Sequence, residues 1–169
     1  MLVEIVPIAS LQFEKVHYYT VRFENRELSE YRDFNIRMQQ DVKNAIELAE
    51  INRYIENIGE EYGALKEHFK DEDAAERLPP PYHQFIESDD PNDFGLRLYC
   101  IRLSPTVVIL LNGDRKKALK VQDCDKCFPH FDRARKIAKK INEAIVEGFI
   151  EVDSENKKIN TEEDFELTI

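Results

Sequence analysis

The chain has 169 residues, of which 42% are hydrophobic, and this is enough for one domain with a sizeable core. No apolar run reaches the roughly 18 to 20 residues that span a bilayer, and Glu4 interrupts the segment where a signal peptide needs an apolar centre, so we expect a cytoplasmic protein with no membrane partner. The formal net charge of −10 disfavours a protein that coats nucleic acid over its whole surface, because such binding needs broad positive surface.

Two strands and two helices are expected in the first third of the chain. Residues 2–8 and 16–23 are rich in Val, Ile, Tyr and Phe, and the polar stretch between them predicts a hairpin. Ser29 is a suitable N-cap for a first helix. From Asp41 onward, apolar residues follow helical spacing in a broad stripe, so this second helix should pack against a sheet and end at Gly59.

The middle of the chain predicts a connector and then a β-meander. A short helix is expected around residues 64–69, and the three prolines within residues 78–82 impose an extended segment. Residues 96–103, 106–111 and 118–121 then read as three consecutive antiparallel strands.

An Asn112-Gly113 turn is expected to join the last two of these strands. Residues 107–111 are apolar at every position, which predicts a strand that is covered on both faces.

The last helix should begin near Phe131 and end at Gly148, with alanine and isoleucine along one side. Residues 151–169 are acidic and poor in apolar side chains, so we expect a mobile tail after a single domain at residues 1–150. The predicted fold class is α+β: an antiparallel sheet of about four to five strands, with N-terminal helices packed on one face and a C-terminal helix.

Positive charge is concentrated in residues 94–121, which hold six Lys or Arg residues and a single acid, Asp114. Because predicted strands would hold these cations on a stiff scaffold, the window predicts a site for a polyanion, with RNA as the leading partner. The alternative is that these side chains only pair with nearby acids at the sheet surface. Arg97 and Arg102 are five residues apart and should point to opposite faces, so only one can line a given site, and we favour Arg97.

Three cysteines, Cys100, Cys124 and Cys127, are an odd number, which favours reduced thiols over a disulfide framework. The spacing of Cys124, Cys127 and His130 can place three ligands around zinc, but a structural zinc normally needs a fourth. We therefore favour small core thiols and expect no metal and no cofactor.

The predicted order of elements is helices followed by a meander of strands. One strand contains Gly95-Leu96-Arg97-Leu98, and the next is followed by Asn112-Gly113 and then basic residues. This arrangement resembles the RelE/HigB family of type II toxins. The resemblance covers residues 16–140 in the order of elements. It implies a small α+β fold and ribosome-dependent cleavage of mRNA, in which basic residues on the sheet stabilise attack by the RNA's own 2′-hydroxyl. It also implies a cognate antitoxin as a second partner.

The resemblance implies roles for individual residues. Arg97 matches the strand arginine that faces the scissile phosphate, Arg115 and Lys117 match basic residues after the following strand, and His130 is the nearest candidate acid or base. The remaining cations near this site are expected to bind RNA: Arg102, Lys116, Lys120, Arg133 and Lys136.

Several features depart from the family pattern, since the chain is longer and more acidic than family members usually are. The alternative hypothesis is therefore the same fold without catalysis, acting as a protein-interaction partner. The nuclease hypothesis requires the basic side chains of residues 94–121 to converge on one positive hollow.

Overall fold

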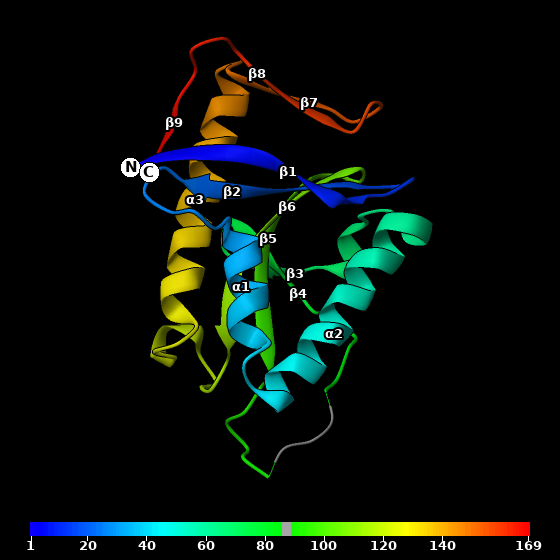
Figure 1. The fold of residues 1–169 in the computed structure, drawn as a ribbon, viewed down its shortest axis with the longest axis vertical. Coiled ribbons are helices and arrows are strands. Elements are labelled where there is room, and N and C mark those ends of the chain that lie inside the picture. The colour runs from blue at the N-terminus through cyan, green and yellow to red at the C-terminus, as the bar shows by residue number, and fades with distance from the viewer. Residues whose placement is uncertain (86–88) are drawn as a thin grey trace.

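The computed structural model describes residues 1–85 and 89–169, which form one seven-stranded sheet, a separate two-stranded hairpin and three α-helices (Figure 1). The helices are α1 (Glu30–Met38), α2 (Val42–Asn57) and α3 (Phe128–Val146). The strands are β1 (Leu2–Gln12), β2 (His17–Phe23), β3 (Lys70–Glu72), β4 (Ala75–Leu78), β5 (Leu96–Ser104), β6 (Val107–Arg115), β7 (Ile150–Asp153), β8 (Lys158–Thr161) and β9 (Leu167–Thr168).

The strand order in the large sheet is β3-β4-β5-β6-β2-β1-β9. All neighbours pair antiparallel except β2 and β6, which are parallel. The α+β class is confirmed, but the expectation of four to five strands is wrong. The additional strands β3, β4 and β9 are two to four residues long, which is too short for alternation of apolar and polar residues to reveal them.

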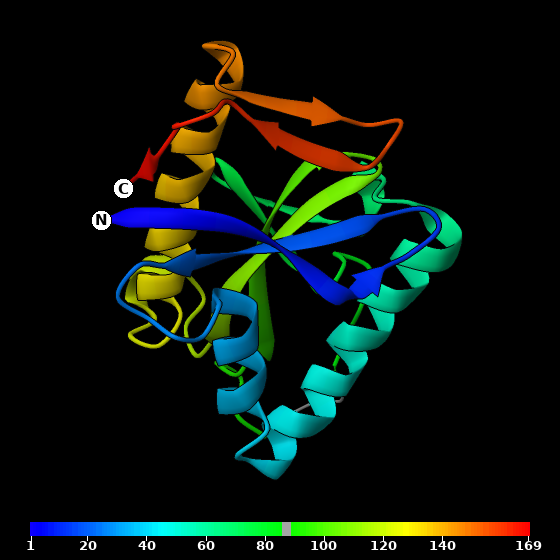
Figure 2. The same cartoon turned by 45° about the horizontal axis from the view of Figure 1, so that its top comes forward.

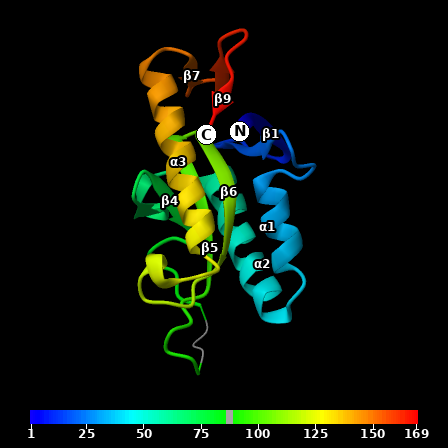
Figure 3. The same ribbon diagram turned by 90° about the vertical axis from the view of Figure 1, so that its left-hand side faces the viewer.

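Helices cover both faces of the sheet (Figure 3). On one face, Leu48, Ile51 and Ile55 of α2 belong to the same buried cluster as Val108 and Leu110 of β6. Phe34 and Met38 of α1 belong to the same cluster, which confirms that the N-terminal helices share one face. The expected cap of α1 is present, since Ser29 accepts the Arg32 N–H, and Asp41 caps α2 by accepting the Asn44 N–H.

The opposite face carries α3, whose residues Ile137 and Ile141 belong to a second buried cluster with Ile109 and Leu111 of β6. Alternate residues of β6 therefore enter different cores. The prediction that residues 107–111 are covered on both sides is confirmed.

The expected Asn112-Gly113 turn is wrong, because β6 continues through both residues to Arg115. Gly113 lies opposite Leu98 of β5, and a Cβ atom at this position would clash with the backbone carbonyl of Arg97. Glycine is therefore required here for close approach of two strands and not for a turn. Residues 118–121 form no strand, and a single 3₁₀ turn at Val121–Asp123 precedes α3.

Residues 151–169, set apart in the sequence as a tail, are packed against the domain. β7 and β8 form a hairpin that is separate from the large sheet (Figure 2), and β9 pairs with β1. Tyr19 Oη donates to the Lys157 carbonyl at 2.9 Å, and Thr106 Oγ1 donates to the Ser154 carbonyl at 2.6 Å. These hydrogen bonds and the buried side chain of Leu167 attach the segment to the domain. Its acidic composition does not reveal such contacts, which is why the sequence indicates a mobile tail.

Candidate functional site

A cavity of about 430 Å³ lies at the end of β4 and β5 and brings together cations from four elements. Lys43 comes from α2, Arg77 from β4, Arg97 from β5 and Arg115 from β6, and His83 of the following connector completes the wall. Carboxylates of Glu47, Asp90 and Asp93 also line it. Whether the cavity can hold an anion therefore depends on which cations these carboxylates already neutralise.

Arg97 forms no ion pair within 4 Å among the residues that the structure describes. Its Nη1 donates to the Leu96 carbonyl at 3.1 Å, and its buried Nε has no acceptor. Burial, reinforced by the nearby charge of Arg77, lowers the pKa of Arg97 to about 10. Within the described residues, Arg97 is therefore a partly buried guanidinium with no carboxylate in direct contact, and Glu72 acts on its charge only from farther away.

Arg77 is a diagonal neighbour of Arg97 on the adjacent strand β4. It lies opposite Tyr99 in the β4–β5 ladder, two residues beyond Arg97 and so on the same face. Its Nη1 donates to the Pro79 carbonyl at 2.8 Å, its Nε lies 3.4 Å from Glu72, and burial lowers its pKa. Arg77 was missed in the sequence because β4 is too short for its strand pattern to be detected.

Lys116 adds a third positive charge beside the cavity. Burial is the main cause that lowers the pKa of Lys116, and the charge of Arg97 is the second. The Lys116 Nζ lies 5.3 Å from the centre of the Phe94 ring. It forms no ion pair within 4 Å in the described part of the chain. Arg97 and Lys116 are thus two neighbouring cations without a carboxylate in direct contact among the described residues.

Arg115 is neutralised instead. Its guanidinium contacts Glu47 at 2.6 Å, Asp93 at 2.7 Å and Asn44 at 2.9 Å, and its side chain is only 7% exposed. Burial alone would lower its pKa, but hydrogen bonds and charge from the two carboxylates raise it. Arg115 joins β6 to α2 and is not available to an incoming anion.

The other predicted cations lie in separate places and most are paired. Lys117 Nζ is 3.7 Å from Asp90, and Arg102 Nε is 3.6 Å from Glu76 on the opposite face from Arg97. On α3, Arg133 contacts Glu30 at 3.1 Å and Lys136 contacts Asp132 at 2.8 Å. Lys120 is exposed in the loop before α3.

His130 lies at the start of α3, outside the cavity. Its Nε2 is 3.5 Å from Nη2 of Arg37, and its buried Nδ1 has no partner. Burial, followed by the charge of Arg37, lowers its pKa to about 4, so the ring is neutral at pH 7. Of the four residues that the sequence predicts to be catalytic, Arg97 and Arg115 line the cavity, Lys117 contacts Asp90 and Asp93 at its wall, and His130 lies elsewhere.

His83, which the sequence does not assign to the anion site, lies at the cavity wall. Its Nδ1 is 2.7 Å from Tyr54 Oη, and its Nε2 is 3.4 Å from Glu50. The only signal in the sequence is its place in a proline-rich connector, because functional side chains often lie on loops held by a rigid scaffold. An imidazole between a phenol and a carboxylate is an arrangement suited to proton transfer.

The cysteines are buried and free. The Cys127 N–H donates to Cys124 Sγ, and Cys127 Sγ donates to the Asp114 carbonyl at 3.2 Å. Burial raises the pKa of Cys127 to about 12, which keeps it as a thiol and not as a metal-binding thiolate. Among residues 1–85 and 89–169, no group of three or more His, Cys, Asp or Glu side chains is placed to hold a metal ion.

Comparisons with known proteins add no further constraint. No protein-family model matches the chain, and neither a curated protein nor a solved structure matches it. Within the described residues, none of the helices combines the length and the apolar composition that crossing a membrane requires.

Proposed function

We propose that this chain is a RelE/HigB-like toxin-type protein of the cytoplasm that binds a phosphate of mRNA at Arg97. The observation that carries the proposal is the guanidinium of Arg97, which has no carboxylate within 4 Å among the described residues and has Arg77 and Lys116 beside it. A buried cation without an anion costs folding free energy, so a side chain of this kind is more easily explained by a ligand than by stability.

A phosphodiester suits this corner of the cavity. Guanidinium groups bind phosphate oxygens through paired hydrogen bonds, and Lys116 contributes a further point charge. The charge that develops on the phosphate during attack by a 2′-hydroxyl would be stabilised most by donors fixed before the reaction begins. Arg97 is fixed on β5 in the middle of the sheet, which meets that requirement.

Proton transfer in this proposal belongs to His83 in place of His130. His83 lines the same cavity as Arg97 and Arg77, whereas His130 faces Arg37. Arg115 and Lys117 have structural and surface roles, because carboxylates already accept their hydrogen bonds or neutralise their charge. The catalytic group is therefore Arg97 with His83, and Arg77 supports phosphate binding.

The test is induced expression in a bacterial host, with growth and the integrity of messages measured together. The proposal expects growth arrest and cleaved mRNA from the wild-type chain, and loss of both in Arg97→Met and His83→Gln variants. Arg102→Met is the matched control, because it removes a strand arginine that is paired with Glu76 outside the cavity. Normal growth with intact messages under wild-type expression would overturn the proposal.

A second function, a protein-interaction module without catalysis, is favoured by a different observation. Carboxylates pair with Arg102, Arg115, Lys117, Arg133 and Lys136, which leaves few of the predicted RNA-binding cations free. An antitoxin-like partner would then be the physiological ligand. Binding of purified RNA that is absent at every salt concentration, together with capture of a defined protein partner by the wild-type chain, would favour this module over the nuclease.

A further inference from the structure

The outer edge of β1 is open over part of its length. β9 pairs only with Leu2 and Val3. The Glu24 N–H donates to the Leu2 carbonyl, while the Ile169 N–H donates to the Met1 carbonyl on the other side. Because backbone groups alternate along a strand, the N–H and C=O of Ile5 point away from β2, beyond the end of β9. They have no ladder partner among the described residues.

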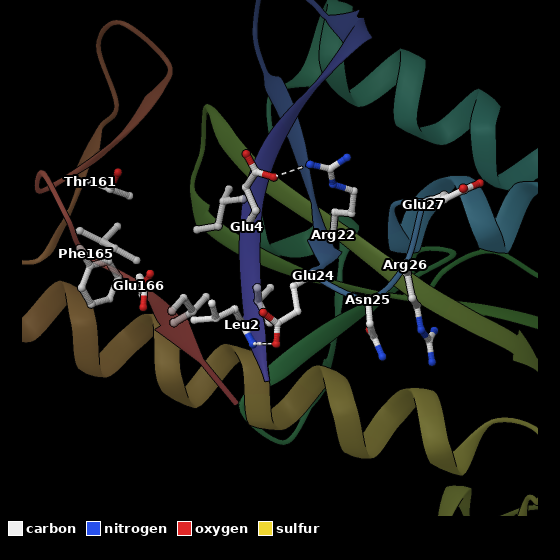
Figure 4. Close-up of a pocket in the computed structure, with 14 residues that line it drawn as sticks. Leu2, Glu4, Arg22, Glu24, Asn25, Arg26, Glu27, Thr161, Phe165 and Glu166 are labelled. Carbon is white, nitrogen blue, oxygen red and sulfur yellow. Dashed lines mark hydrogen bonds and ion pairs between the residues drawn. The ribbon is translucent and has the colours of Figure 1, made fainter.

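A groove of about 830 Å³ lies along this edge (Figure 4). It is bounded by β1, by the loop after β2, and by Thr161 and residues 165–167, the last of which begins β9. Apolar side chains of Val3, Ile5, Ile150 and Phe165 line part of it. The groove therefore combines unpaired backbone groups at a strand edge with a partly apolar wall, two features that suit an extended peptide.

The rim of this groove is acidic. Arg22 is paired with Glu4 at 2.8 Å, and Arg26 lies 3.7 Å from Glu30, so neither arginine is free to balance other acids. Glu27 and Glu166 are exposed on opposite walls and form no ion pair within 4 Å in the described part of the chain. Residues 161–167 also contain four acids and no base.

We propose that this groove binds an extended, basic segment of a partner protein, which adds to the sheet as a strand along β1. Its backbone pairs with the N–H and C=O of Ile5, its apolar side chains fill the groove and its lysines or arginines face Glu27 and Glu166. A second copy of this chain fits poorly, because pairing of two β1 edges would bring two acidic rims together. The proposal does not depend on the RNA function, since no lining residue is shared with the Arg97 cavity.

The test uses a capped peptide of alternating lysine and valine, about eight residues long, a usual strand length. Binding should slow hydrogen exchange of the Ile5 amide by at least about tenfold, measured by NMR at saturation. A peptide of alternating glutamate and valine should not bind. Two lysine peptides N-methylated on opposite alternating positions should differ, because only one of them loses the N–H groups that face β1.

The protein variant for this test is Glu27→Lys with Glu166→Lys, which should weaken binding of the lysine peptide by on the order of tenfold. Its control is Glu14→Lys with Glu60→Lys, two exposed acids outside the groove that give the same change in net charge. Equal affinity for both variants, or equal binding of both N-methylated peptides, would overturn the proposal. A stable homodimer that blocks the peptide would also overturn it and identify a second copy as the occupant.

Discussion

Arg115 and Arg97 lie on adjacent strands and are expected to affect stability in opposite directions. Replacing Arg115 with alanine leaves Glu47 and Asp93 without their main cation, and their side chains are only 7% and 3% exposed. Removing one partner of a buried ion pair typically costs about 3–5 kcal/mol. Lys43 still contacts Asp93 at 2.7 Å, and Glu47 still accepts the Leu96 N–H, so we expect the lower end, about 3 kcal/mol.

Replacing Arg97 with methionine removes a charge that has no carboxylate partner within 4 Å among the described residues. The fall in its pKa from 12.5 to about 10 corresponds to an upper bound of about 3.5 kcal/mol of destabilisation of the charged form, at about 1.4 kcal/mol per pKa unit. Because the side chain is only partly buried, solvent screening reduces that value. Arg97→Met should therefore leave the free energy of unfolding unchanged or raise it.

Urea denaturation of the two variants at pH 7 measures both effects, provided that the dependence on denaturant is unchanged. Repeating it in acid gives a second check. Burial alone would raise the pKa of Asp93, but hydrogen bonds from Lys43 and Arg115 lower it below its unfolded value, so this stabilisation is complete above about pH 5 and is lost as pH falls further. The difference between wild type and Arg115→Ala should shrink in the same range. A loss below about 1 kcal/mol at pH 7, or a strongly destabilised Arg97→Met variant, would refute this division of roles.

Three further predictions concern the rest of the fold. Because the pKa of His130 is lowered to about 4, the unfolded chain binds more protons than the folded chain between about pH 6.5 and 4, and wild-type stability should fall as the pH is lowered through that window. The fall should be less steep in His130→Gln, as measured by thermal unfolding across pH. Gly113→Ala should cost more than about 2 kcal/mol, because the new methyl group meets the Arg97 carbonyl of the adjacent strand, and urea denaturation should show it. Lys117→Ala should change stability by less than about 1 kcal/mol, since its contacts with Asp90 and Asp93 are 3.7 and 3.9 Å long and its side chain is 46% exposed.

The longer elements were predictable because their periodicity and caps are local properties of the sequence. The hairpin of β1 and β2, the capped helices α1 and α2, and the doubly covered strand β6 all follow from such patterns. Strands β3, β4 and β9 were not predictable, since each is defined by its partner in the sheet more than by its own residues. The Asn112-Gly113 pair was misleading for a related reason: glycine permits both a turn and a close strand contact, and only the neighbouring strand distinguishes them.

The charge of the candidate site also depends on tertiary partners that the local sequence does not reveal. Residues 94–121 are strongly basic when counted along the chain, but Glu47 and Asp93 compensate Arg115, and Glu76 compensates Arg102. Of these acids only Asp93 is close to the window in sequence, and it lies just before it. Counting charges along a window of sequence therefore overestimates the positive charge available to a ligand when the cations are paired with acids from distant parts of the chain.

To identify an anion-binding cation, the presence or absence of a carboxylate partner in the folded structure is a better criterion than the concentration of charge along the sequence. A paired cation such as Arg115 stabilises the fold and would have to break buried contacts before it could bind an anion. A cation such as Arg97, which has no carboxylate within 4 Å among the described residues, lowers the stability of the ligand-free fold. Binding of an anion removes this destabilisation, and the interaction between the two charges also contributes to the binding free energy. An oligoribonucleotide, if bound in the cavity, should therefore raise the melting temperature of wild type more than that of Arg97→Met, whereas Arg102→Met should respond as wild type does.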